Sequence, residues 1–147
     1  MQERFNTFTV LIAKLGRIIR RIKTEEMQEF NLKSTHVSCL FHLHLHGALT
    51  SKQLAEVCDE DKAAVSRSLE YLEKNGYIFT VKDATKRYKC PIELTDKGRE
   101  VALRISEKIE GYLSIANQGI SEEDRIVMYK TLLTISENLQ SAYDGEA

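Results

Sequence analysis

The chain has 147 residues, of which 42% are hydrophobic and 29% charged, and its formal net charge is −1. This length suits one domain, and the composition is that of an ordinary globular protein. No apolar run approaches the roughly 20 residues of a membrane-spanning helix, and the N-terminus lacks the apolar core of a secretory signal, so we expect a cytoplasmic protein.

The first predicted element is a long amphipathic helix over residues 3–29. Its apolar residues are spaced alternately three and four positions apart, a heptad seam that is suited to packing on a long partner helix. The residues of this seam are Phe5, Phe8, Ile12, Leu15, Ile19 and Ile22. Because a small domain alone cannot bury such a seam, we expect these residues to form a homodimer interface.

Two shorter helices follow. The first is predicted over residues 35–46 and ends at Gly47, a residue type that commonly closes helices. The second is predicted over residues 50–57, where Thr50 and Gln53 have the spacing of a capping box.

The next predicted helix spans residues 62–75, after an acidic turn that ends at Asp61, a good N-cap residue. Val65, Leu69 and Leu72 recur at helical spacing and are expected to be buried. The residues expected to face outward near the start of this helix are Lys62, Ala63, Ser66 and Arg67.

Two alternating strands with a basic tip are predicted over residues 79–94. The tip contains Lys86 and Arg87, and Lys89 follows on the second strand. The residues expected to share the apolar face of the second strand are Tyr88, Cys90, Ile92 and Leu94. Between residues 62 and 89 basic residues outnumber acidic ones, which is the local charge excess that contact with phosphates requires.

Two long helices complete the chain. Thr95 and Asp96 are predicted to cap a helix that runs to Ala116, and Ser121 to cap the last one. The predicted fold is therefore a single domain over residues 1–147, mostly α with a small β-hairpin. Residues 34–95 form a winged helix-turn-helix for DNA binding, and residues 1–33 and 96–147 form dimerisation helices.

A winged helix-turn-helix commonly places one helix in the major groove and its hairpin on the DNA backbone or in the minor groove. Arg67 is a leading candidate for base contact, together with Ser66, because arginine can donate two hydrogen bonds to guanine. Ser51 and Lys52 open a helix whose N-terminus can bind a phosphate. The predicted DNA-contacting residues are Ser51, Lys52, Lys62, Ala63, Ser66, Arg67, Lys86, Arg87 and Lys89.

The segments HGALTSKQLAE, KAAVSRSLEYLEKNGYI and IELTDKGRE, in this order, resemble the MarR/SlyA family of bacterial transcription regulators. The resemblance covers nearly the whole chain. It implies an obligate homodimer with interleaved terminal helices, a pseudo-palindromic DNA operator, and control by a small ligand or by thiol oxidation. We therefore expect a transcriptional repressor that a small-molecule effector releases from DNA.

Other functions with the same fold remain open, namely a thiol- or metal-sensing regulator and a winged helix that binds proteins. His42 and His46 share a helix face, but two ligands do not complete a zinc site, so we predict no metal and no cofactor. The three cysteines form no CxxC motif and are expected to be reduced, with Cys39 in the core. The chain contains no GxSxG, HExxH or phosphate-binding glycine loop, so we do not expect an enzyme.

Overall fold

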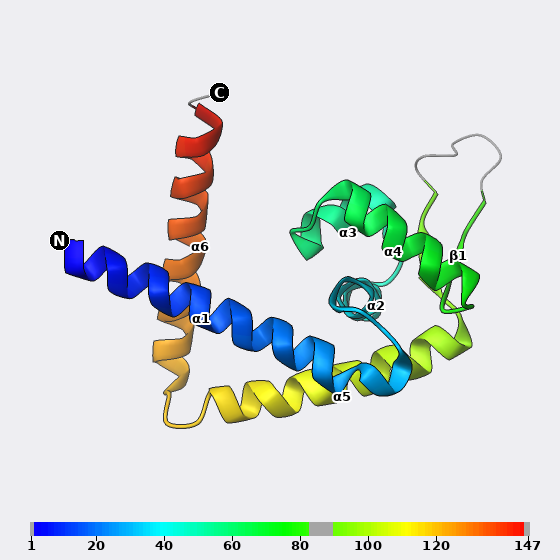
Figure 1. Cartoon of the computed structure of the whole chain (residues 1–147), viewed down its shortest axis with the longest axis horizontal. Coiled ribbons are helices and arrows are strands. Elements are labelled where there is room, and N and C mark those ends of the chain that lie inside the picture. The colour runs from blue at the N-terminus through cyan, green and yellow to red at the C-terminus, as the bar shows by residue number, and fades with distance from the viewer. Residues whose placement is uncertain (1, 83–89, 146–147) are drawn as a thin grey trace. The chain divides into compact units, whose positions relative to one another are not determined.

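A computed structural model describes residues 2–82 and 90–145, with side chains described from residue 6 onward. In chain order its elements are α1 (Gln2–Glu26), the short 3-10 helix η1 (Gln28–Phe30), α2 (Ser34–His46), α3 (Ser51–Cys58), α4 (Lys62–Lys74), β1 (Ile78–Thr80), β2 (Ile92–Leu94), α5 (Asp96–Ala116) and α6 (Glu122–Gly145) (Figure 1). The predicted fold class is confirmed: the described residues are mostly helical, with one two-stranded antiparallel sheet.

The chain divides into two compact units, Met1–Glu107 and Lys108–Ala147. In the first unit α2 packs against both α3 and α4, and these two helices pack against each other (Figure 1). The largest fully buried side chains of this core are Met27, Val37, Cys39, Leu40, Leu54, Val65, Leu72 and Ile105. Each of the three packed helices contributes apolar side chains, so the core holds the helix-turn-helix together.

The first helix ends earlier than predicted, at Glu26 rather than at residue 29. Met27 leaves the helical conformation, with φ −102° and ψ 5°, and its side chain is buried in the core. After η1 the backbone turns at Asn31, which has the left-handed conformation. The core position of Met27 therefore outweighs the helical periodicity of the sequence around it.

The two strands pair in register, with Ile78 opposite Leu94 and Thr80 opposite Ile92. Leu49, which precedes α3, exchanges two backbone hydrogen bonds with Ile92 at 3.3 and 2.8 Å. Each strand has three residues. The second strand is therefore shorter than predicted, because it begins at Ile92 and Cys90 lies before it. Tyr88 lies outside the described residues. The predicted alternation holds within β2, where Ile92 and Leu94 are buried and Glu93 is exposed.

The predicted capping box of α3 is confirmed. The Gln53 N–H donates to Thr50 Oγ1 at 3.2 Å, and the Thr50 N–H donates to Gln53 Oε1 at 2.9 Å. At the start of α6 the Asp124 N–H donates to Ser121 Oγ at 3.1 Å, as predicted. Asp61 does occupy the N-cap position of α4, but its exposed side chain accepts no capping hydrogen bond.

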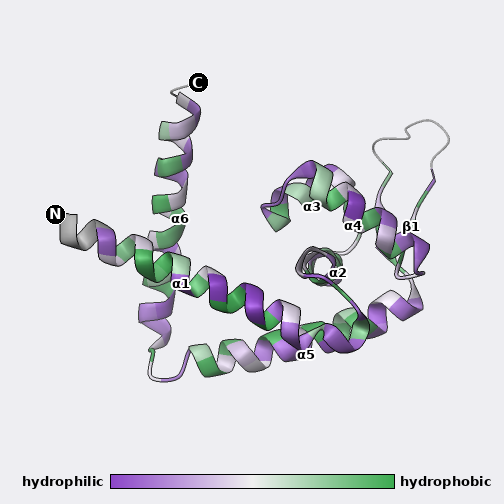
Figure 2. Ribbon diagram, viewed as in Figure 1, coloured by the Kyte–Doolittle hydropathy of each residue, from purple (hydrophilic) through white to green (hydrophobic). Residues whose placement is uncertain are grey.

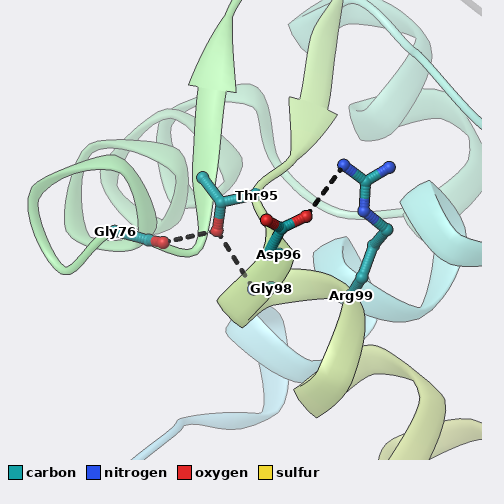
Figure 3. A network of polar contacts seen from close by, with 5 residues as sticks. All are labelled: Gly76, Thr95, Asp96, Gly98 and Arg99. Atoms are coloured by element: carbon teal, nitrogen blue, oxygen red, sulfur yellow. Dashed lines mark hydrogen bonds and ion pairs between the residues drawn. The ribbon is translucent and has the colours of Figure 1, made fainter.

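Thr95 joins the end of α4 to the start of α5 (Figure 3). Its hydroxyl donates to the carbonyl of Gly76, just after α4, and accepts the N–H of Gly98 in the first turn of α5 at 3.0 Å. Its backbone N–H donates to the Tyr77 carbonyl at 3.0 Å. The predicted cap at Thr95 is thus confirmed, and it also fixes the chain that leads from α4 to the sheet.

The second unit contains the end of α5 and the whole of α6. None of the described residues of α6 is buried, although the helix carries apolar side chains along its length (Figure 2). Across the described residues, no helix combines the length and the apolar character that crossing a membrane requires.

Candidate nucleic-acid interface

The turn between α3 and α4 sets the direction of α4. Asp59 ends α3 in the left-handed conformation, with φ 49°, and its N–H donates to the carbonyls of Ala55 and Glu56 in the last turn of α3. Helix α4 begins three residues later at Lys62, and the Val65 N–H donates to the Asp61 carbonyl at 3.0 Å. A short turn of this kind holds the first turn of α4 close to the end of α3.

Burial of one face of α4 exposes the other. Val65, Leu69 and Leu72 are buried as predicted, and Ser68 is buried with them. The residues predicted to face outward, Lys62, Ala63, Ser66 and Arg67, are all exposed. The exposed face at the start of α4 therefore offers an ammonium, a methyl, a hydroxyl and a guanidinium group to a partner.

The start of α3 lies beside this face. Ser51 and Ser66 line the same cavity of about 280 Å³, together with residues of both strands. Ser51 and Lys52 are exposed. The first N–H groups of a helix have no carbonyl acceptor within the helix. In α3 the Gln53 N–H is bonded to the Thr50 side chain, which leaves the N–H groups of Ser51 and Lys52 available. This helix end is suited to an anion.

The wing begins next to the same cavity. Beyond β1 the Val81 N–H donates to the Pro91 carbonyl at 2.9 Å, which continues the pairing of the two strands by one step. The predicted contact residues Lys86, Arg87 and Lys89 lie in the segment 83–89, outside the described residues. Their contact with DNA stays a prediction.

A second, larger cavity of about 730 Å³ lies on the other side of α4. The cavity is lined by the end of α1, the segment that follows it, the start of α2, and one side of α4. None of the lining residues is an aspartate or a glutamate. Lys33 and Arg67 are its cationic side chains. The residues that line it are Thr24, Gln28, Asn31, Leu32, Lys33, Ser34, Thr35, His36, Ala64, Arg67, Ser68 and Tyr71.

His36 and Tyr71 are two of the residues that line this cavity. Their rings stack with centroids 4.3 Å apart, and the Tyr71 hydroxyl donates to the Asn31 carbonyl at 3.2 Å. Burial lowers the pKa of His36, and the neighbouring Lys33 lowers it further, so the imidazole is neutral near pH 7 and accepts the Lys33 N–H at Nδ1. The sequence contains no local signal for this stacked pair, because its members lie on different helices.

The predicted dimerisation seam lies exposed on α1. Ile12, Leu15 and Ile19 are 42%, 54% and 51% exposed, while Phe8 and Ile22 are half-buried. The side chain of Phe5 lies outside the described ones. Figure 2 shows hydrophobic residues at intervals along α1. The exposure leaves the seam accessible, and its role in a dimer stays a prediction.

The histidine and cysteine side chains form no metal cluster in the part of the chain that the structure describes. The rings of His42 and His46 stack at 5.7 Å, as their shared helix face predicts. Cys39 is fully buried, as expected for a core thiol, whereas Cys58 and Cys90 are partly exposed.

The MarR family model matches residues 30–87 of the chain. An HTH-type transcriptional regulator of Bacillus subtilis, the uncharacterised YwaE, is 22% identical over 139 residues, which are 95% of this chain and 81% of the relative.

Among solved structures, the transcriptional regulator SlyA superimposes with a TM-score of 0.83 at 21% identity, over 95% of this chain and 99% of SlyA. Staphylococcus aureus MepR in its complex with DNA superimposes with a TM-score of 0.78 at 20% identity, over 90% of this chain and 97% of MepR. The fold of the chain is thus that of these solved transcriptional regulators. The chain therefore resembles MarR-family transcriptional regulators over residues 30–87 and shares the fold of the solved ones.

Proposed function

We propose that the protein is a homodimeric repressor that binds a pseudo-palindromic DNA operator through α4 and the wing. The observation that carries the proposal is the exposed face of α4 between Lys62 and Arg67, held directly after the turn from α3. The solved complex of MepR with DNA supports the proposal by similarity of fold.

In the proposed complex the first turns of α4 lie in the major groove. Arg67 donates two hydrogen bonds to a guanine and Ser66 contacts a neighbouring base edge, while the methyl group of Ala63 fits a thymine methyl. Lys62 neutralises a phosphate, and the start of α3 at Ser51 and Lys52 binds another through backbone N–H groups. The wing residues Lys86, Arg87 and Lys89 contact the DNA backbone or the minor groove.

The exposed apolar residues of α1 support a dimer. Hydrophobic side chains of α5 and α6 are exposed as well, including Leu113, Ile126, Leu133 and Leu139. Helices from both chain ends of two copies, interleaved, would cover these surfaces, since monomeric soluble proteins rarely expose large contiguous apolar patches. Two copies then present two α4 helices to half-sites about one DNA turn apart.

The cavity of about 730 Å³ beside α4 is suited to the effector. We expect a small organic acid, because the lining offers Lys33, Arg67 and the start of α2 but no carboxylate side chain. An acid bound there would draw Arg67 away from a guanine and favour an arrangement of the two α4 helices that does not fit the operator. Only a ligand with different affinities for the two arrangements can cause this shift.

Replacing Arg67 by alanine tests the proposal on duplexes selected from the source genome by binding. Loss of a bidentate contact to guanine removes about 1–3 kcal/mol of discrimination, so specific affinity should fall roughly 5- to 150-fold, and affinity for random duplex much less. The control is Lys74→Ala, which removes a positive charge from the last turn of the same helix. Arg67→Ala with the affinity of the parent for the selected duplex would refute the assignment.

A further inference from the structure

The cavity of about 730 Å³ beside α4 is lined by hydrogen-bond donors that have no acceptor within the described part of the chain. Among the described residues, neither Lys33 nor Arg67 forms an ion pair, and the hydroxyl of Ser68 forms no hydrogen bond. Ser68 is only 5% exposed and lines the cavity. Because a buried hydroxyl costs free energy unless it is bonded, this position is suited to a ligand atom that accepts a hydrogen bond.

His36 contributes a second buried donor to the cavity. Its side chain is 6% exposed, and its Nδ1 accepts the Lys33 N–H at 3.0 Å. The neutral ring therefore carries its proton on Nε2, and this N–H donates to no described residue. Stacking on Tyr71, with the ring centroids 4.3 Å apart, holds the imidazole in place. The Nε2–H group is thus a fixed donor for an acceptor in the cavity.

The start of α2 adds backbone donors. Lys33 occupies the N-cap position without a side-chain capping bond, and Ser34 and Thr35 of the first turn line the cavity. The first N–H groups of a helix have no carbonyl acceptor within it, and the helix dipole favours an anion beside them. The cavity therefore offers two positive charges, a helix N-terminus and two buried side-chain donors to one anion.

The charge and number of these donors favour a phosphate monoester over a carboxylate. A carboxylate has one negative charge and two oxygen atoms, whereas a phosphate monoester has about −1.5 to −2 charges at pH 7 and three terminal oxygens. The larger charge matches the two cations, and the third oxygen leaves fewer donors unpaired. A phosphodiester of a DNA backbone has one charge and two free oxygens, so it matches the cavity less well than a monoester does.

The remaining lining has room for the organic part of such an ester. The volume of about 730 Å³ lies within the range of roughly 300–1,000 Å³ that is typical of sites for small molecules. Leu32, Ala64 and the ring of Tyr71 give the cavity an apolar part. An ester with a small apolar group therefore fits the lining better than inorganic phosphate alone.

We propose that this cavity binds a small phosphate monoester. The phosphate lies at the start of α2, between Lys33 and Arg67, and accepts hydrogen bonds from the hydroxyl of Ser68 and the Nε2–H of His36. The organic group packs on Tyr71. The inference names the chemical class of the effector, and it rests on the proposed function only for the effect on DNA.

Calorimetric titration of the full-length protein with phenyl phosphate tests the site. Phenyl sulfate and methyl phenyl phosphate have a similar shape but a single negative charge, so each should bind at least roughly tenfold more weakly. Ser68→Ala and Lys33→Ala should each weaken the binding of phenyl phosphate by roughly tenfold, because each removes a donor to a charged acceptor. The control Lys74→Ala removes a positive charge from the last turn of α4, outside the lining, and should bind phenyl phosphate as the parent does.

Circular dichroism spectra that match the parent confirm that the variants are folded. No binding of phenyl phosphate at millimolar concentration, equal affinity for phenyl sulfate, or the affinity of the parent in Ser68→Ala would each overturn the assignment. Methyl phenyl phosphate that binds as tightly as phenyl phosphate would also overturn it, and would assign the cavity to a phosphodiester of the DNA backbone.

The effect on DNA is measured separately, with the selected duplex. Phenyl phosphate should weaken duplex binding by the parent over the concentrations at which it fills the cavity, and phenyl sulfate at the same concentrations should not. Ser68→Ala should keep its duplex affinity in both. Phenyl phosphate that binds without any loss of duplex affinity overturns its assignment to the effector class. Protein that binds no duplex is a failure of the proposed function, and the calorimetric titration still decides whether the phosphate site exists.

Discussion

Replacement of Gly98 by alanine tests the junction between α4, the sheet and α5. A Cβ atom at Gly98 would overlap the carbonyl oxygen of Tyr77 and would lie 2.9 Å from the Tyr77 carbonyl carbon and 3.3 Å from Leu94 Cδ2. The overlapping atom belongs to the backbone, so it cannot rotate aside as the end of a flexible side chain would. The same carbonyl accepts the N–H of Thr95, so moving it also disturbs the cap of α5.

Three effects set the size of the change. Forcing an extra carbon into a filled site costs about 1–3 kcal/mol. Loss of the hydrogen bond between Thr95 and Tyr77 costs about 1 kcal/mol, and the better helix propensity of alanine offsets about the same amount. We therefore expect Gly98→Ala to lower the free energy of unfolding by about 1–3 kcal/mol.

Urea unfolding followed by circular dichroism measures this change. Every variant is measured at the same protein concentration, because the proposed dimer would gain stability with concentration. Gly111→Ala is the matched control: it lies in the same helix, and a Cβ there meets no atom within 4 Å in the monomer. It should be unchanged or more stable by up to about 1 kcal/mol. If Gly98→Ala is as stable as Gly111→Ala, Gly98 does not pack against the Tyr77 carbonyl as closely as described.

Two further predictions concern association and pH. Ile12→Glu and Ile19→Glu should each shift the proposed dimer to a monomer in sedimentation, because the interface would bury an unpaired carboxylate at a high cost in free energy. The control Lys14→Glu, on the same helix, should sediment as the parent does. If Ile12→Glu sediments as a dimer, the interface lies elsewhere. Burial lowers the pKa of His36 and His42 in the folded protein. As the pH drops, these histidines therefore bind protons in the unfolded chain before they do so in the folded protein. The free energy of unfolding should then fall below about pH 6.5. The double variant His36→Gln, His42→Gln should lose part of this slope in urea titrations at several pH values, and an unaltered slope would show that neither histidine carries it.

Local patterns predicted the elements and the exposed face of α4. The Thr50 and Ser121 caps formed with the partners that their spacing indicates, and the period of Val65, Leu69 and Leu72 determined which face of α4 is buried. These features depend on residues within a few positions of each other, which is why sequence alone predicts them.

Contacts between distant residues could not be predicted in this way. The stacking of His36 on Tyr71 joins two different helices, and no spacing rule relates the two residues. The early end of α1 has the same origin, because the place of Met27 in the core is decided by tertiary packing. Both cavities beside α4 arise from such packing, so neither could be predicted from the sequence.

The most direct test of the account is the affinity of the purified protein for its selected duplex over a series of salt concentrations. Neutralised phosphates release counterions, so the logarithm of the association constant should fall linearly with the logarithm of the salt concentration, by about 0.9 for each phosphate contacted. A steep slope for the parent, with specific affinity lost in Arg67→Ala but kept in Lys74→Ala, is the predicted result. Absence of duplex binding even at about 50 mM salt would contradict the account.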